Sequence, residues 1–563
     1  IERFNRDVLS KYHIYNSVFI TLPFDSIDNT GVLLPLFTET CETGFKKQET
    51  PKEIFDFFSN KFLNNASETE KIDLMFRFIQ YIERQIVLFD AIEDAAFPEV
   101  NNMEGRGSLR DIKEKSDANE KDDELIQFLE DFNVRTVLTA HPTQFYPGPV
   151  LGIINDLTEA IRQNDLLQIK QLLAQLGKTP FIQNEKPNPY DEAVSLIWYL
   201  ENVFYATSGE IVHYLQKNIL NGNAIQNQLI KLGFWPGGDR DGNPFVTTEI
   251  TLKVAERLRT SILKCYYVEM RNLKRKLTFS GVDTLVAELE HKLYRSVFYS
   301  KGEIYITLDE LLSQLNKIRS IIIEKHQSLY LDELEALLVK INLFGFHFAT
   351  LDIRQNSKIH NAVFKDVVNF YLNSDSNVFP KNYFELTENE KISILSKVKG
   401  DLNPSDFENE ITRSTLESVQ AIKTIQENNG EEGANRYIIS NNESALNVME
   451  TFAMIRLNDW EDPTVDIIPL FESVDDLQNA HSIMEQLYTN PEYSKHLQAR
   501  GNKQTIMLGF SDGTKDGGYL MANWSIYQAK ISLTEISRKY GIKAIFFDGR
   551  GGPPARGGGK THK

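Results

Sequence analysis

The chain has 563 residues and a mass of 64.7 kDa, enough for a large core and more than one lobe, because single domains usually stop near ~250 residues. Its formal net charge of -18 and isoelectric point near 5.2 argue against nucleic acid or an anionic membrane as the main partner. No apolar run reaches the ~18 residues of a membrane span, and the two cysteines, Cys41 and Cys265, match no metal or disulfide spacing. We therefore expect a cytoplasmic protein that captures any anionic ligand in a local basic pocket.

A polar stretch near residue 125 divides the chain. Residues 103–124 contain Gly105, Gly107 and Ser108, followed by a run of charged residues with almost no apolar anchors. This composition is typical of a linker. We therefore predict an N-terminal helical region over 1–125 and a second region over 126–563.

The second region alternates long helical stretches with short apolar runs. We count seven runs, at 134–139, 233–235, 344–351, 437–439, 465–471, 505–510 and 543–547. Each is followed by a chemically capable polar residue, and strands with this property are typical of a barrel whose active site lies at the C-terminal face. The fold class predicted is α/β: a predominantly helical chain around a (β/α)8 TIM-type barrel, with long helical insertions and about seven of the eight strands present.

Two carboxylates close consecutive predicted strands, Glu472 and Asp512. A single acid after a strand is more often a helix cap, but two acids on neighbouring strands would lie side by side. A site with only two hard oxygen ligands from the protein suits Mg²⁺ or Mn²⁺, because these ions complete their coordination shell with water and substrate oxygens. Zinc is disfavoured because no Cys or His cluster accompanies the pair.

Basic residues at other strand ends are candidates for anion binding. Arg354 and Arg550 could bind phosphate or carboxylate as bidentate forks. Lys515, three residues after Asp512, could face the same ligand or cap the next turn. Residues 239–241, Asp-Arg-Asp, could instead be a buried ion-pair network.

His141 lies between Ala140 and Pro142, where a buried structural histidine and a catalytic one are about equally plausible. Pro142 favours catalysis slightly because it stiffens the turn that carries His141.

The glycine- and arginine-rich segment 546–563 is typical of an anion cradle, in which backbone N–H groups approach a ligand closely. A disordered RNA-binding tail is one alternative, but the apolar run at 544–547 favours a loop attached to a core strand. A nucleotide-binding P-loop is the other alternative, and it is disfavoured because Pro554 occupies a position that needs glycine.

Several of these motifs together resemble phosphoenolpyruvate carboxylases. The matching segments are Val137–Gln144, Gly237–Pro244, Leu351–Gln355, Pro469–Glu472, Gly509–Gly517 and the Gly549–Gly552 loop. They occur in the same order from about residue 134 to the end, and a weaker likeness covers 32–36.

The resemblance implies carboxylation of phosphoenolpyruvate by bicarbonate, giving oxaloacetate and phosphate through carboxyphosphate and an enolate. It implies a Mg²⁺ or Mn²⁺ cofactor and a homotetramer regulated by small acids. The roles that it implies are metal binding by Glu472 and Asp512, substrate binding by Arg354, Arg550, Gly551 and Gly552, and catalysis by His141, Lys515 and Arg556.

The chain also departs from the family pattern. Residues 145–149 stand where the family commonly has two arginines, and Asp548 replaces a usual histidine beside the glycine loop. Family members continue well past this loop, so we expect a fragment that is inactive alone. Two alternatives remain: another phosphoenolpyruvate-using barrel enzyme, such as a dikinase, and a non-catalytic helical assembly protein.

Overall fold

The computed structural model describes residues 1–20, 30–63, 66–103, 105–139, 146, 148–181, 187–220, 227–299, 305–374 and 377–550. The chain divides into two compact units. Unit 1 comprises residues 1–122 and 141–186, and unit 2 comprises residues 123–140 and 187–563. The division expected near residue 125 stays a prediction.

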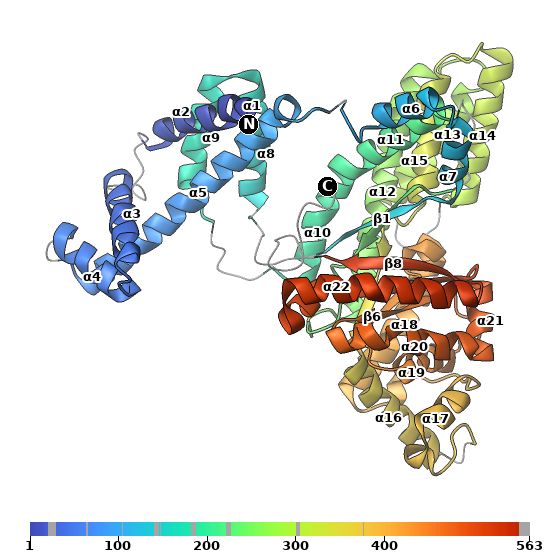
Figure 1. The fold of residues 1–563 in the computed structure, drawn as a ribbon. Coiled ribbons are helices and arrows are strands. Elements are labelled where there is room, and N and C mark those ends of the chain that lie inside the picture. Colours follow the sequence, from blue (N-terminus) through green and yellow to red (C-terminus); the bar gives the residue numbers. More distant parts are fainter. Residues whose placement is uncertain are drawn as a thin grey trace. The chain divides into compact units, whose positions relative to one another are not determined.

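Most helices of unit 1 gather around one long helix, α5 (Figure 1). Its helices are α1 (Glu2–Phe4), α2 (Ser10–Ile20), α3 (Thr30–Lys46), α4 (Pro51–Phe62), α5 (Glu68–Val100), α6 (Leu109–Ala118), α8 (Gly148–Gln163) and α9 (Leu166–Lys178). A capping box of Ser67 and Glu70 starts α5. Leu88 and Ile92 of α5 pack with Leu157 and Ile161 of α8 in a buried cluster.

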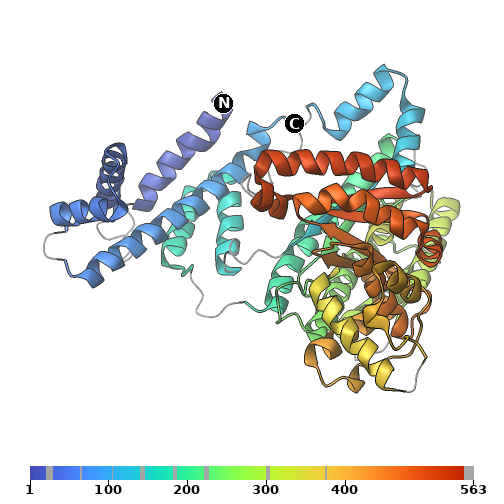
Figure 2. The ribbon, with the colours of Figure 1, turned by 60° about the horizontal axis from the view of Figure 1, so that its bottom comes forward.

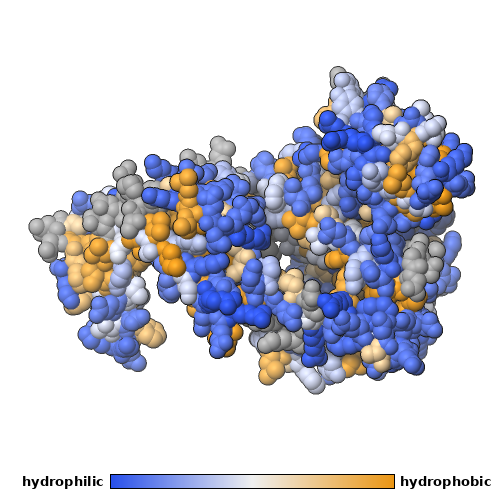
Figure 3. All heavy atoms as spheres, turned by 90° about the horizontal axis from the view of Figure 1, so that it is seen from above, coloured by the Kyte–Doolittle hydropathy of each residue, from blue (hydrophilic) through white to orange (hydrophobic). Residues whose placement is uncertain are grey.

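A second face of α5 is also apolar. Ile72, Phe76 and Ile79 are 55%, 52% and 52% exposed, and Ile86 on the same side is 48% exposed. Apolar side chains reach the surface of unit 1 in Figure 3. The helix therefore carries one buried apolar face and one open apolar face.

The stretch expected to be a linker contains a helix. Ser108 accepts a hydrogen bond from the Asp111 backbone N–H and so caps α6. Lys113 and Lys115 then pair with acids four residues away on the same helix. The stretch predicted as a linker thus contains a helix, along which the charge run forms ion pairs.

Unit 2 contains the strands, and all of their pairings are parallel. One sheet has the order β1-β2-β3 and the other β4-β5-β6-β7-β8. The strands are β1 (Val134–Leu138), β2 (Ile230–Phe234), β3 (Thr350–Leu351), β4 (Ile353–Asn356), β5 (Arg436–Ser440), β6 (Asp466–Phe471), β7 (Lys503–Gly509) and β8 (Lys543–Gly549).

Helix α7 (Asp122–Asp131) precedes β1, and helices lie between successive strands except between β3 and β4, as parallel pairing requires. Those of unit 2 are α10 (Pro189–Tyr199), α11 (Tyr205–Asn218), α12 (Thr248–Lys276), α13 (Asp283–Phe298), α14 (Leu308–Lys325), α15 (Leu331–Phe344), α16 (Ser357–Asn373), α17 (Glu388–Leu395), α18 (Glu410–Asn429), α19 (Ala445–Leu457), α20 (Val474–Thr489), α21 (Pro491–Ala499) and α22 (Phe510–Lys539). The last helix, α22, packs against α20 and β8 (Figure 2). Among the described residues, none of the helices has the length and apolarity to cross a bilayer.

The predicted strand at 344–351 is displaced. Phe344 ends α15, and the strand begins only at Thr350. Asp352 then separates β3 from β4, so that one extended segment contributes to both sheets. Arg354 consequently lies within β4, whereas the sequence placed it beyond a strand end.

Asp352 is a buried acid at this break, with 0% exposure. Its Oδ2 accepts a hydrogen bond of 3.0 Å from Trp235 Nε1, and its Oδ1 lies 3.4 Å from Arg436 Nε. Trp235 also packs with Phe547 of β8 at the buried cluster of Ile438, Ile468, Leu470 and Met507. The two sheets therefore share one core.

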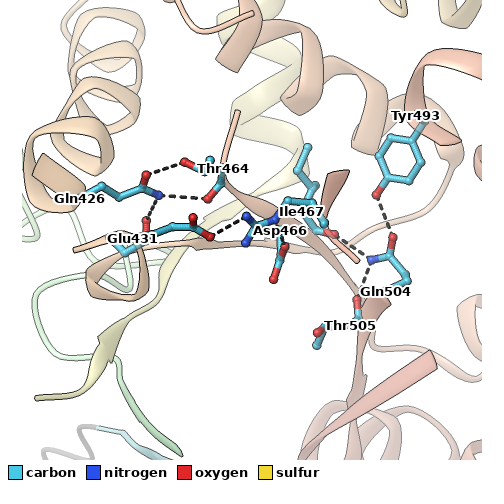
Figure 4. Close-up of polar contacts among 10 residues, drawn as sticks. Gln426, Glu431, Thr464, Asp466, Ile467, Tyr493, Gln504 and Thr505 are labelled. Atoms are coloured by element: carbon cyan, nitrogen blue, oxygen red, sulfur yellow. Dashed lines mark hydrogen bonds and ion pairs between the residues drawn. The ribbon is translucent and has the colours of Figure 1, made fainter. Parts of the chain in front are cut away.

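The N-terminal ends of β6 and β7 are closed by polar contacts (Figure 4). Buried Gln504 donates to the Ile467 carbonyl at 2.9 Å and accepts from Tyr493 Oη at 3.0 Å. Arg500 bridges Asp466 at 2.7 Å and Glu431 at 2.6 Å. These contacts satisfy the side chain of Gln504 and pair Arg500, which suits this end of β6 and β7 to stability.

Gly238 provides a test of how tightly the two sheets meet. A Cβ there would lie 2.2 Å from the Asp352 carbonyl oxygen, which is backbone and cannot yield. We expect Gly238→Ala to destabilise unit 2 by about 2 kcal/mol or more, measured as a lower midpoint of thermal unfolding. The matched control is Gly152→Ala in α8, where no atom lies within 4 Å. Equal midpoints for Gly238→Ala and the wild type would contradict this packing.

Candidate active site

Glu472 and Asp512 lie at the C-terminal ends of neighbouring strands, as predicted. Glu472 directly follows β6, and Asp512 is the third residue of α22, which follows β7. The register pairs Phe471 with Leu508, so Glu472 comes opposite Gly509. Sheet topology thus brings together two acids that are 40 positions apart in sequence.

Glycines allow this close approach. A Cβ on Gly509 would lie 3.2 Å from Glu472 Cα, and one on Gly513 would lie 3.4 Å from the Glu472 carbonyl oxygen. Both contacts are at or inside ordinary van der Waals distance. The first turn of α22 can therefore lie against the end of β6 only with small residues at these positions.

Glu472 is held in an environment that opposes its ionisation. Burial, followed by the negative charge of Asp512, raises the pKa of Glu472 to about 7, although the positive charge of Arg354 acts in the opposite direction. A divalent cation between Glu472 and Asp512 would relieve this repulsion. Within the described residues, no group of three or more His, Cys, Asp or Glu could hold a metal, so substrate and water would complete the shell.

Lys515 is paired with Asp512. Their side chains lie 2.7 Å apart across one helical turn, and both are substantially exposed, Lys515 at 68% and Asp512 at 50%. A metal ion bound to Asp512 would compete with Lys515 for the Asp512 carboxylate. The Lys515 ammonium group, once displaced, could move toward a ligand.

Arg354 lies on β4 and is held by two acids of the segment that follows β2. Its Nε is 3.2 Å from Asp239 Oδ1, its Nη2 is 2.6 Å from Asp241 Oδ2, and its guanidinium lies 5.0 Å from the Trp235 ring centroid. Burial acts to lower the pKa of Arg354, but Asp239 and Asp241 outweigh it and the pKa is raised. Arg354 therefore stays charged in a largely buried site.

The pKa values of Asp239 and Asp241 shift in opposite directions. Burial raises the pKa of Asp239 to about 6, with Arg354 opposing. Burial also acts to raise the pKa of Asp241, but the charge and hydrogen bonds of its neighbours, Arg354 first among them, lower it. Asp241 is thus the stronger partner of Arg354.

Arg240 takes no part in this ion pairing. It donates to the carbonyl and hydroxyl oxygens of Ser414 at 2.8 and 3.1 Å. The alternative that Arg240 forms a buried ion-pair network with its neighbours was therefore wrong, because Asp239 and Asp241 pair with Arg354 instead. The sequence contained no signal for this partner, which lies over a hundred residues away.

Arg550 follows β8 and lies 4.6 Å over the ring of Phe510, the first residue of α22. It is exposed at the same end of the strands as Asp512. Asp548, an acid that could weaken anion binding here, pairs with Lys530 at 2.7 Å. Sequence reasoning missed Lys530 because it lies on α22 with no motif around it. His141, Gly551, Gly552 and Arg556 lie outside the described residues.

The chain is similar to known carboxylases. The family model described as phosphoenolpyruvate carboxylase matches residues 93–297 and 287–563. A phosphoenolpyruvate carboxylase of Nitrosomonas eutropha is 29% identical over 509 residues, covering 78% of this chain and 54% of that protein. One from Nitrosomonas europaea is 29% identical over 523 residues, covering 81% and 55%. The chain spans about half the length of these relatives.

The raised pKa of Glu472 predicts a pH dependence of stability. An unfolded Glu titrates near ~4.3, so between about pH 4 and pH 7 the unfolded chain ionises first and folding weakens as pH rises. Glu472→Gln removes this effect. In metal-free buffer, we expect the difference between the unfolding midpoints of Glu472→Gln and the wild type to grow in favour of Glu472→Gln from about pH 5 to about pH 8.

The exposed acid Asp475, changed to Asn, is the matched control for charge removal near this strand end. A gain from Glu472→Gln that stayed constant across the pH range would show that Glu472 does not titrate as described.

Proposed function

Because the chain belongs to the phosphoenolpyruvate carboxylase family, we propose that it carries a reaction centre for carboxylation of phosphoenolpyruvate by bicarbonate. The observation that supports this most is a pair of carboxylates, Glu472 and Asp512, at the C-terminal ends of neighbouring parallel strands, together with the largely buried cation Arg354 on β4 of the same sheet. The products would be oxaloacetate and phosphate. The matched segment covers about half of each relative. Substrate and activity are therefore proposed for the whole protein.

Arg354 and Arg550 would bind the phosphate of phosphoenolpyruvate. Arg354 has two nitrogens occupied by Asp239 and Asp241, which leaves Nη1 for an anion. Arg550 is exposed beside α22 and could approach from the other side. Two guanidinium groups would fix the phosphorus for attack by a bicarbonate oxygen.

The first step would transfer the phosphoryl group. A bicarbonate oxygen would bond to phosphorus while the bond from phosphorus to the enol oxygen breaks, giving carboxyphosphate and the enolate of pyruvate. Carboxyphosphate would then lose phosphate to yield CO₂, and the enolate carbon would attack CO₂. His141 would position carboxyphosphate or manage its proton, with Arg556 on the bicarbonate side and Lys515 as a further catalytic cation.

Glu472 and Asp512 fit a Mg²⁺ or Mn²⁺ ion, because they are hard oxygen donors on neighbouring strands and the charge of Asp512 opposes ionisation of Glu472. Such an ion would supply positive charge next to the developing enolate. Gly551 and Gly552 would let the loop backbone approach the phosphate.

We propose that the two sheets are parts of one (β/α)8 barrel. They share the segment broken at Asp352, and Lys543 at the start of β8 pairs at 2.8 Å with Asp131, just before β1. If β3 and β4 count as one broken strand, the described residues supply seven strands. An eighth strand between β8 and β1 would close the barrel. A cytoplasmic homotetramer is the corresponding proposal for the assembled protein.

The test is oxaloacetate formation from phosphoenolpyruvate, bicarbonate and Mg²⁺ by the purified product of the complete gene, without nucleotide. Glu472→Gln should lower kcat by about a hundredfold or more, and Arg354→Met should raise KM for phosphoenolpyruvate by about tenfold or more. Asp475→Asn, exposed in the first turn of α20, is the matched control. Turnover that required a nucleotide would favour a dikinase-like enzyme, and no turnover in the wild type would favour a non-catalytic role.

A further inference from the structure

Arg436, the first residue of β5, is a buried arginine with few contacts to oxygen. Its side chain is 5% exposed, and its Nε lies 3.4 Å from Oδ1 of Asp352. Among the residues that the structure describes, neither of these two atoms has a hydrogen bond. The Arg436 guanidinium instead lies 5.1 Å from the centroid of the Phe547 ring. Because buried polar groups in proteins are nearly always hydrogen-bonded, this guanidinium is suited to a further acceptor.

Arg135 on β1 reaches the same part of the core. Its Nη1 donates to Thr350 Oγ1 at 2.6 Å, which is the one hydrogen bond that its guanidinium makes with the described residues. Thr350 and Asp352 are buried and two positions apart in one extended segment, so their side chains share a face about 7 Å apart. Burial, followed by the positive charge of Arg436, lowers the pKa of Arg135 to about 10. The two guanidinium groups therefore lie close together over this face.

The other acids around the two arginines have cations of their own. Glu432 pairs with Lys231 at 2.7 Å, and Asp466 pairs with Arg500 at 2.7 Å. His347 Nε2 lies 3.7 Å from Glu432 Oε2, but burial lowers the pKa of His347 to about 4. The imidazole is therefore neutral at neutral pH and adds no charge.

Arg135 and Arg436 consequently share one acid, Asp352, and the group of three carries one positive charge in excess. A buried charge without a counter-charge is strongly destabilising, and a buried guanidinium without acceptors has also lost its hydrogen bonds to water. A single negative charge would balance the group. Two or three oxygens in one plane would also match the fork of donors that each guanidinium presents.

We propose that Arg135 and Arg436 bind a small, planar, singly charged oxyanion, such as bicarbonate or formate, inside unit 2. Arg354 is not part of this site, because its guanidinium is paired with Asp239 and Asp241. The site therefore goes beyond the proposed function and does not depend on it.

The first experiment measures thermal unfolding of the purified product of the complete gene during titration with sodium nitrate, a planar and singly charged probe. Sodium gluconate keeps the ionic strength constant. We expect the unfolding midpoint to rise by about 2 °C or more and to saturate, because an anion that binds only the folded protein stabilises it. Arg436→Met and Arg135→Met should each abolish this rise. The matched control is Arg538→Met, which changes an exposed arginine in the last turn of α22.

The same titration of Arg354→Met separates this site from the proposed phosphate site. We expect Arg354→Met to keep the rise in midpoint. Loss of the rise in Arg354→Met, or equal rises in Arg135→Met, Arg436→Met and the wild type, would overturn the proposal.

Stability in gluconate alone is an independent measurement. There, Arg135→Met should unfold at the wild-type midpoint or above it, because it removes the excess charge. A lower midpoint would show that the protein itself supplies a counter-charge, and the proposal would fail. Should Arg135→Met not fold, Arg135→Lys keeps the charge without the planar fork, and we expect it to need about tenfold more nitrate for half of the rise. An unchanged nitrate requirement would contradict binding by this guanidinium.

A crystal structure of the complete protein in sodium nitrate locates the anion. We expect planar density within hydrogen-bond distance of Arg135 and Arg436. A carboxylate of the protein there, or water alone, would overturn the proposal. Titrations of Arg354→Met with bicarbonate and with phosphate then compare two physiological anions, and we expect the larger rise in midpoint with bicarbonate. A larger rise with phosphate would overturn the assignment to a planar, singly charged ligand.

Discussion

The pairing of residues 238–240 with Arg354 is the constraint on which the candidate site depends. It fastens the segment after β2 to β4, the half of the broken extended segment that belongs to the second sheet. It also places Asp239 and Asp241 against the largely buried guanidinium of Arg354. The orientation of this arginine is therefore set by a contact between the two sheets.

The two ends of the strands have opposite character. At the N-terminal end, Gln504 and its neighbours satisfy one another's hydrogen bonds. At the C-terminal end, buried polar atoms lack partners among the described residues, including Oγ of Ser440, Oγ of Ser511 and both side-chain atoms of Asn442. Unsatisfied buried polar atoms cost stability unless water or a ligand binds them. The polar atoms at the C-terminal end are therefore available to water or to a ligand.

Departures from the family pattern are compensated locally where the structure describes them. Asp548 introduces a negative charge beside Arg550, but Lys530 of α22 neutralises it at 2.7 Å. The pair is about one third exposed on each side, so its contribution to stability is small. The pair offsets the negative charge of Asp548 beside Arg550, which the sequence around Asp548 does not suggest.

Much of the strand arrangement could be predicted from short apolar runs followed by polar residues. Five of the seven runs overlap observed strands closely, and a sixth, at 233–235, shares only its first two residues with the end of β2. The seventh run, at 344–351, begins at the end of α15, and the strand starts only at Thr350. Periodicity alone does not distinguish a short apolar run at a helix end from a strand. The helix within 103–124 was missed because its charged residues pair with one another and bury little.

The sequence by itself determined which residue types close the strands, since periodicity and turn chemistry are local properties. Only the tertiary structure decided their partners. In the extended segment 239–241, alternate side chains point to opposite faces, so Asp239 and Asp241 meet Arg354 while Arg240 turns to Ser414. Arg354 is 113 positions from Asp241, and no local pattern encodes a contact made by strands that pair only after the chain folds.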